Sequence, residues 1–305
     1  GDTTIELFTN DRTPYDIDSA MIMQHGTHVV ANMNDNLYSQ DQLDRIKAKY
    51  PEITISLQPY TGAGPYPQTY YDIGPVLVEK ADIKIQKFFD DYTKMQEVLQ
   101  PQATLPFAGK FIYGGPPHYL NSYRGLSDAT AVCDFDPKAF VLDDGGDALI
   151  DTADLSPTKT RAVAYDAEEM AREALKLAMI PMPYQVRFGD FDPRGVPSFE
   201  KLLTMAYNKA LGLKLCSTDY YYAIYFDDDY WVFNCNHNNP SSGRRERIDD
   251  LTPRSEIYID LRYLYGLITG IYHWNDAEGG SHYRVRRYPD VFSEEAQLFM
   301  FFFSI

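Results

Sequence analysis

The residues best suited to chemistry are a few histidines and the carboxylates near them, and their spacing limits which reactions the chain can perform. The sequence contains His25, His28, His118, His237, His273 and His282. They form no HxHxDH cluster, no HExxH pair and no local set of three ligands, so the sequence alone specifies no complete metal site. It also lacks GxSxG, GxxxxGK[ST] and GxGxxG, which argues against the commonest hydrolase, nucleotide triphosphatase and dinucleotide-binding interpretations.

The first candidate site lies in MIMQHGTHVVANMNDN, residues 21–36. His25 and His28 flank a Gly-Thr pair at a position typical of a hairpin turn, so they are either exposed turn residues, which the pattern favours, or ligands. Asp35 directly follows a strand, where α/β folds present ligand-binding residues. The pattern alone favours a different role for Asp35, capping the next helix.

Three later segments allow both a functional and a structural interpretation. His118, in YGGPPHYLN, is either a proton carrier or ligand in a loop with a fixed backbone, or a solvated loop histidine. The DDGGD segment at 143–147 is either a calcium site or, as its spacing favours, a tight acidic turn. Trp274 either lines a pocket or packs in a half-buried position.

The elements that would position these residues follow from hydrophobic periodicity. Strands are expected over 3–8 and 19–33, and a short helix follows Asp35. A buried strand, ITISLQPY, comes next, and 82–99 has the clearest helical spacing, followed by a further strand in LPFAGKF. This order of strands and helices predicts a layered α/β domain.

The sequence pattern predicts a second domain in the later part of the chain. Asp166 and Ser198 are expected to cap two helices. A hairpin around Asp227–Asp229 then predicts an α+β arrangement. The expected organisation is an α/β domain over 1–150, a linker over 151–164 and an α+β domain over 165–305.

Composition excludes several classes of partner. With 28 basic and 44 acidic residues the net charge is −16, which disfavours nucleic acid and anionic membrane surfaces. No signal peptide and no apolar run of about 20 residues is visible. Cys133, Cys216 and Cys235 show no CxxC spacing, so neither a disulfide framework nor a thiolate zinc site is expected, and a cytoplasmic setting fits best.

Four segments in order carry a family resemblance: NMND at 32–35, YTGAGPYP at 60–67, LPFAGKF at 105–111 and IYHWNDAEGGSHYRVRRYP at 271–289. Together they resemble the later part of the metallo-β-lactamase-fold sugar-nucleotide hydroxylases. These enzymes are of the CMP-N-acetylneuraminate hydroxylase and UDP-N-acetylmuramate hydroxylase type, and they are related more distantly to the ascorbate-6-phosphate lactonase group.

The resemblance implies a fold and a set of site residues. Residues 1–150 would be the second half of a metallo-β-lactamase-type αββα sandwich, followed by a sterol-carrier-like C-terminal domain. Asp35 would match the carboxylate that lies between two metals. His118 would be catalytic, and Tyr66, Asn121 and Arg124 would line the substrate side, with Arg124 as a partner for phosphate or carboxylate.

The sequence also departs from this family. The half with the HxHxDH cluster and any Rieske-type iron–sulfur segment are absent, and Pro106 and Phe107 stand where many relatives place their last histidine ligand. Iron or zinc is therefore expected only together with the missing ligand half, and a hydroxylase would need an external iron–sulfur electron donor. We expect the chain to be a fragment, one piece of a split protein or a relative that has lost its metal.

Half of a two-sheet sandwich would leave an apolar sheet face uncovered. We therefore expect Ile22, Val29, Val30 and the 53–57 strand to pack against another polypeptide, such as the missing N-terminal half, or a rearranged segment. The leading functional prediction is an iron-dependent hydroxylase of a nucleotide-linked sugar or similar anionic metabolite. The alternatives are a metal-dependent hydrolase of the lactonase or phosphodiesterase type, and a non-catalytic binding or assembly subunit.

Overall fold

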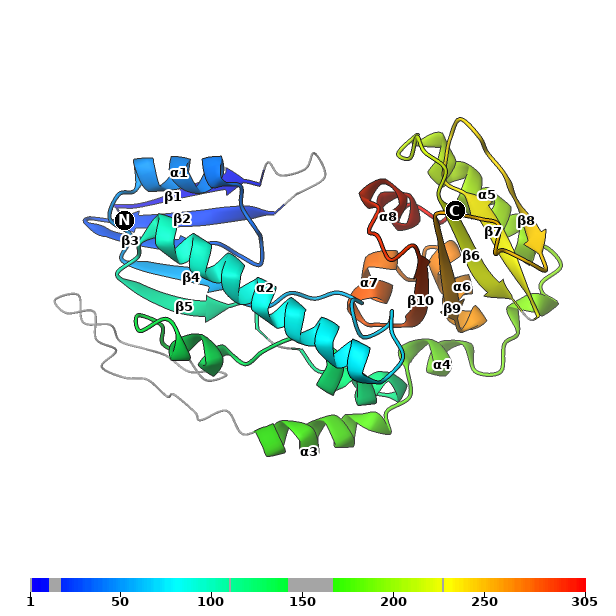
Figure 1. Cartoon of the computed structure of the whole chain (residues 1–305), viewed down its shortest axis with the longest axis horizontal. Coiled ribbons are helices and arrows are strands. Elements are labelled where there is room, and N and C mark those ends of the chain that lie inside the picture. Colours follow the sequence, from blue (N-terminus) through cyan, green and yellow to red (C-terminus); the bar gives the residue numbers. More distant parts are fainter. Residues whose placement is uncertain (1, 11–17, 110, 142–166, 227) are drawn as a thin grey trace. The chain divides into compact units, whose positions relative to one another are not determined.

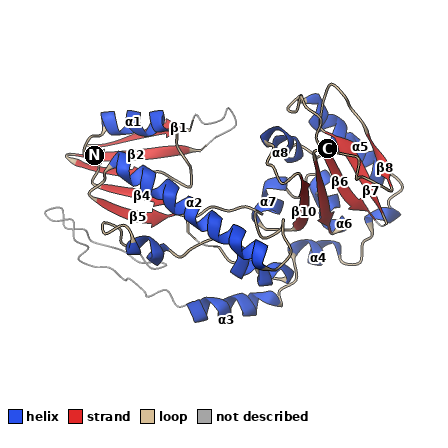
Figure 2. Cartoon of the chain, viewed as in Figure 1, coloured by secondary structure: helices blue, strands red, loops and turns tan. Residues whose placement is uncertain are grey.

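The computed structural model describes residues 2–10, 18–109, 111–141, 167–226 and 228–305. The chain divides into two compact units, each with one five-stranded sheet (Figures 1 and 2). The first unit is 1–63, 79–111 and 125–172, and the second is 64–78, 112–124 and 173–305. Residues 64–78 and 112–124 thus group with the second unit, although we expected them in the first. The predicted 151–164 linker lies outside the described residues.

The first unit is a mixed sheet with strand order β1-β2-β3-β4-β5. Its elements are β1 (Thr3–Thr9), β2 (Ser19–His25), β3 (His28–Asn32), α1 (Gln40–Lys49), β4 (Ile55–Pro59), α2 (Pro75–Leu99), β5 (Ala103–Phe107) and a 3₁₀ segment, η2 (Ala129–Asp134). Strands β1, β2 and β3 pair antiparallel, whereas β3, β4 and β5 pair parallel. The crossovers through α1 and α2 confirm the predicted layered α/β arrangement of this unit.

The hairpin at the start of the sheet has the predicted turn. His25 pairs with His28, and Gly26 between them has φ of +58°, a conformation that glycine adopts without steric cost. Both histidines are exposed. Helix α2 is longer than expected. It begins at Pro75, and proline is tolerated there because the first backbone N–H of a helix has no acceptor within the helix.

Helices α1 and α2 cover one face of this sheet (Figure 2). Leu43 of α1 and Met95 of α2 belong to one buried cluster with the strand residues Ile22, Val29 and Ala31. The expectation that Ile22 and Val29 pack against another polypeptide is therefore wrong. The chain covers these two residues with its own helices.

The opposite face of the same sheet is apolar and only partly covered. The strand register places on it Ile5, Leu7, Met21, Met23, Val30, Ile55, Leu57, Leu105 and Phe107. Ile5 and Leu7 are 61% and 65% exposed, and the other seven are partly exposed. An apolar sheet face of this extent is typical of a surface that packs against a further layer.

The second unit is built on a mixed sheet with strand order β10-β9-β6-β7-β8. Its elements are η1 (Pro116–Tyr123), α4 (Pro183–Phe188), η3 (Pro193–Gly195), α5 (Phe199–Gly212), β6 (Tyr221–Phe226), β7 (Asp229–Asn234), β8 (Ser242–Arg245), β9 (Arg254–Ile259), α6 (Leu261–Ile268), α7 (Trp274–Gly279), β10 (Tyr283–Tyr288) and α8 (Glu294–Phe301). Helix α3 (Ala167–Ala178) spans the boundary between the units, and so does the start of α2, whose residues 75–78 belong to the second unit. The predicted hairpin is present, with Phe226 paired to Asp229.

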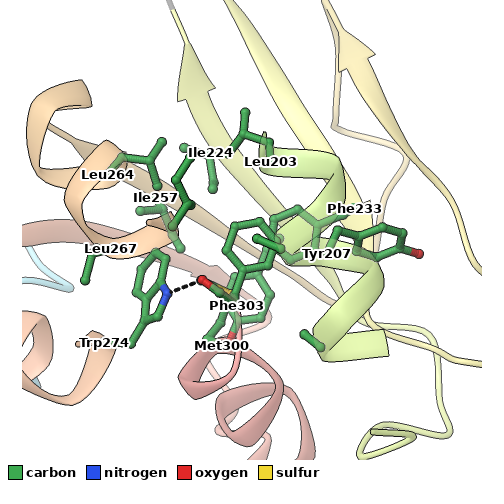
Figure 3. Close-up of a cluster of buried hydrophobic side chains, with 14 of the residues drawn as sticks. Leu203, Tyr207, Ile224, Phe233, Ile257, Leu264, Leu267, Trp274, Met300 and Phe303 are labelled. Atoms are coloured by element: carbon green, nitrogen blue, oxygen red, sulfur yellow. Dashed lines mark hydrogen bonds between the residues drawn. The ribbon is translucent and has the colours of Figure 1, made fainter. Parts of the chain in front are cut away.

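A large aromatic cluster forms the core of the second unit (Figure 3). Phe233 of β7 stacks on Phe303 with ring centres 4.6 Å apart, and Tyr207 of α5 packs beside Phe233. Trp274 is fully buried, and its indole N–H donates to the carbonyl oxygen of Phe303 at 2.7 Å. Trp274 is therefore a core residue, more deeply buried than the half-buried packing role that we expected.

Two capping predictions have different outcomes. Ser198 precedes α5, but its side chain makes no capping hydrogen bond, and Asp166 lies outside the described residues. The DDGGD segment also lies outside them. No helix within the described ranges is long and apolar enough to cross a membrane.

Candidate functional site

Two places in the chain gather groups that can do chemistry, one in each unit. In the first unit, the carboxyl ends of the parallel strands β3, β4 and β5 meet at one sheet edge. Asp35 lies just beyond β3, Thr61 and Gly62 follow β4, and Ala108 follows β5. Ligand sites of α/β sheets form at such an edge.

The loops of this edge are tightly held. The Asn32 carboxamide accepts a hydrogen bond from the Asn34 N–H at 2.9 Å, and Asn34 has φ of +57°. Gly62 faces the ring of Phe88 so closely that a Cβ atom would lie 2.9 Å from it. The bond between Asn32 and Asn34 fixes the backbone just before Asp35, whose carboxylate is exposed.

Asp35 does not cap the following helix, so the alternative that the sequence pattern favoured is wrong. Ser39 is the N-cap of α1, and its hydroxyl oxygen accepts from the Gln42 N–H at 3.2 Å. The Gln42 side chain bonds back to the Ser39 N–H, which completes a capping box. The carboxylate of Asp35 thus remains available for a ligand.

No group of three or more His, Cys, Asp or Glu side chains that could hold a metal ion occurs among the residues that the structure describes. His25 and His28 cannot complete one with Asp35, because they lie at the opposite end of β3, which spans roughly 13 Å from its first to its last residue. The described residues therefore do not form a metal site by themselves. Asp35 is one possible ligand whose partners would have to come from elsewhere.

The second unit contains a pocket of about 390 Å³ built from five separate stretches of the chain. Its walls are Gln68, Thr69, Tyr71, Asp72, Ile73, Pro116, Pro117, Tyr119, Leu120, Met182, Tyr184, Tyr258, Ser281, His282, Tyr283 and Arg284. A pocket of this size, with aromatic walls and a few polar groups, has the general form of a small-molecule site.

A buried hydrogen-bond network supports the wall of this pocket. The Gln68 amide nitrogen donates to the Tyr113 hydroxyl at 2.9 Å and to the Ser281 hydroxyl at 3.1 Å. Ser281 donates to the same Tyr113 oxygen at 2.6 Å. Burial raises the pKa of Tyr113, so its phenol stays neutral. The network ties the loop after β4 to the turn before β10.

Asn121 and Arg124, both predicted to bind substrate, support the backbone of Tyr113, a member of this network. The Asn121 side chain accepts from the Tyr113 N–H at 2.8 Å and donates to the Tyr113 carbonyl oxygen at 2.9 Å. Arg124 is buried, and its Nε donates to the carbonyl oxygen of Asn121. The two residues hold the Tyr113 backbone in place, and neither lines the pocket.

His118 and Tyr66 lie in the second unit as well, but they do not line the pocket. His118 is partly buried, and its Nδ1 lies 3.1 Å from the carbonyl oxygen of Gly115. The Tyr66 hydroxyl lies 3.4 Å from that of Tyr71, which does line it. Asp35 belongs to the other unit.

His282 is a titratable pocket residue that sequence reasoning did not single out. Its ring packs on Tyr263 with centres 4.6 Å apart, and burial lowers the pKa of the imidazole, although the charge of Asp276 opposes this effect. Gly280 makes room for the ring, since a Cβ atom at that position would lie 2.4 Å from Nε2 of His282. The GGSH sequence was the available signal, but its partners at 68–73 and 116–120 are far away in the chain.

Comparisons with known proteins give little further evidence. No family model and no curated protein matches the sequence. Among solved structures, one similar chain is described as a zinc-dependent hydrolase of the metallo-β-lactamase superfamily from Thermotoga maritima, with a TM-score of 0.28 and 14% identity. The match covers 44% of this chain and 52% of that one, so this chain spans about half the length of that structure. A similarity at this level carries no argument about fold or function.

Proposed function

We propose that this chain is part of a metal-dependent enzyme with a metallo-β-lactamase-like sandwich, and that its first unit is one sheet-and-helix half of that sandwich. The observation that carries the proposal is the uneven covering of the β1–β5 sheet. Helices α1 and α2 bury one face, while the other remains apolar and partly open. A second sheet packed there would complete four layers, helix, sheet, sheet and helix.

Asp35 is the residue through which the chain would take part in the chemistry. It is exposed, it follows the carboxyl end of β3 and it makes no capping bond. A carboxylate is a suitable ligand for zinc or iron, but one ligand does not make a site. The remaining ligands would come from a polypeptide segment outside this sequence, and the bound metal would activate oxygen or water.

The substrate in this proposal is a nucleotide-linked sugar or a related anionic metabolite, and hydroxylation is the reaction that the sequence resemblance favours. An external iron–sulfur protein would then supply electrons. In this proposal His118 would be catalytic, and Tyr66, Asn121 and Arg124 would bind substrate; none of the four lines the pocket of the second unit. The second unit, a mixed sheet with helices α5 to α8 around its core, would be the sterol-carrier-like module.

A second candidate function is a non-catalytic binding or assembly subunit. The absence of a three-ligand cluster from the described ranges favours it. In this case the open sheet face would still bind a partner, but Asp35 would be a solvated carboxylate.

Metal analysis separates the candidates. The chain is purified alone and with the polypeptides that bind it, and each sample is measured by inductively coupled plasma mass spectrometry. Iron in proportion to the complex supports the oxygenase, and zinc or manganese supports the hydrolase. A complex without metal under all conditions contradicts the enzyme proposal and leaves the binding subunit.

A further inference from the structure

Most hydroxyl groups on the wall of the second unit's pocket donate their protons to acceptors within the protein. The hydroxyl groups of Tyr71, Tyr258 and Tyr283 each donate to a carboxylate of the protein. Thr69 donates to a backbone carbonyl oxygen, and Ser281 donates to a phenol oxygen. What these five hydroxyl groups can still offer a ligand is oxygen lone pairs.

The remaining polar groups of the pocket add to this excess of acceptors. Gln68 is 2% exposed, and its Oε1 has no hydrogen-bond donor, whereas its nitrogen donates to protein oxygens. Tyr184 is hydrogen-bonded to the carboxylate of Asp260. Arg284 is the cationic residue of the wall, and its guanidinium is paired with Asp72. Apart from Arg284, His282 and Tyr119, the polar side chains of the wall therefore offer a ligand hydrogen-bond acceptors rather than donors.

The net charge of the chain and the aromatic side chains of the pocket both favour a cationic ligand. Five tyrosines line the pocket: Tyr71, Tyr119, Tyr184, Tyr258 and Tyr283. Aromatic rings attract cations through their negative faces. The chain carries a net charge of −16, which raises the local concentration of cations.

We propose that this pocket binds a small free amine, whose ammonium group donates hydrogen bonds to the oxygens of the wall while its apolar part lies against the tyrosine rings. The site requires no metal and lies within the second unit, so it is independent of the function proposed for Asp35. Failure of one proposal leaves the other standing.

Benzylamine and benzoate are a suitable pair of probes, because they share a ring and differ in the sign of their charge. Binding of each to the full 305-residue chain is measured by isothermal titration calorimetry. We expect benzylamine to bind at least about tenfold more tightly than benzoate, a difference of about 1.4 kcal/mol. Equal or tighter binding of benzoate would show that Arg284 dominates the pocket and would overturn the proposal, as would the absence of benzylamine binding.

Two matched variants locate the binding. Ile73 lines the pocket and is 56% exposed, whereas Val76 is 52% exposed and does not line it. Ile73→Trp should weaken benzylamine binding by about tenfold or more, and Val76→Trp by less than about twofold. Circular dichroism checks that both variants fold. Unchanged binding in Ile73→Trp, or equal losses in the two variants, would contradict a site in this pocket.

A lysine side chain of a partner protein carries the same chemical group as a free amine. Nα-acetyl-lysine N-methylamide, which has a peptide group on each side of its Cα atom, tests this source. We expect it to bind about tenfold more weakly than benzylamine. Tighter binding of the lysine probe would assign the pocket to a protein partner and overturn the proposal of a free amine.

Discussion

Gly280 is the position where one added carbon atom should have the clearest effect. A Cβ atom there would lie 2.4 Å from Nε2 of His282 and 3.0 Å from the carbonyl oxygen of Asp276. The backbone of Gly280 has φ of −80°, which any residue adopts, so only steric contact opposes a side chain. We expect Gly280→Ala to lower the free energy of unfolding by about 1–3 kcal/mol, as overpacking does.

The neighbouring residue is a matched control for this substitution. An added Cβ at Gly279 would meet no atom within 4 Å, so Gly279→Ala should not lower the stability. Urea unfolding followed by circular dichroism measures both variants. Similar stabilities would contradict the close packing of His282 on Gly280.

His282 should also make the stability depend on pH. Burial lowers its pKa below the ordinary value of 6.5, so between these two pKa values the unfolded chain binds more protons than the folded one. This contribution is present above about pH 6.5 and is lost as the pH falls through the window toward the folded pKa. Wild type should therefore lose more stability than His282→Gln between about pH 7.5 and pH 5.5.

Unfolding curves at several pH values test this expectation, with His28→Gln as the control because His28 is an exposed turn residue. If the His282→Gln and wild-type curves run parallel across the window, the imidazole is not buried as the structure describes.

At the scale of elements, the start of helix α1 distinguishes the two roles that the sequence allowed for Asp35, helix cap and ligand. The Ser39 hydroxyl caps the helix, and Asp35 does not. Ser39→Ala should therefore lower the free energy of unfolding by about 1 kcal/mol. Asp35→Asn should leave it unchanged within about 0.5 kcal/mol, as exposed substitutions usually do. A larger loss in Asp35→Asn than in Ser39→Ala would mean that Asp35 has a structural role.

The open face of the β1–β5 sheet leads to a second prediction at this scale. In the isolated chain this face should bind an apolar fluorescent dye, because its side chains remain partly exposed. Leu7→Lys places a charge on the face and should reduce the dye fluorescence. Ile83→Lys, at an exposed position on α2, should change it little. Equal effects of the two substitutions would show that the face has no special apolar character.

Local signals predicted the elements well where neighbours in the sequence decide the structure. The HGTH turn, helix α1 and the hairpin between β6 and β7 depend on short spacings, and all three are present. We expected Ile22 and Val30 on the same uncovered face, but the strand register places them on opposite faces, and the helices cover the face of Ile22. Local signals did not decide which face the helices cover. That choice depends on packing between distant segments.

At the scale of the whole molecule, the sequence predicted two regions with different architectures but not how the chain alternates between them. The loop after β4 and the η1 segment lie early in the sequence, yet they group with the second unit. The pocket is built there by residues as far apart as Gln68 and Ser281, which contact each other directly. No spacing rule reaches across 213 residues, so this site appears only in the folded chain.

The most direct test of the proposed function is the metal content of the chain in complex with the polypeptides that bind it, compared among wild type, Asp35→Asn and Asp41→Asn. Asp41 is an exposed carboxylate of α1 in the same unit and serves as the control. We expect bound metal in proportion to the wild-type complex, loss of at least about half of it in Asp35→Asn and full retention in Asp41→Asn. A metal-free wild-type complex, or an Asp35→Asn complex that retains all of its metal, would contradict a metal-ligating role for Asp35.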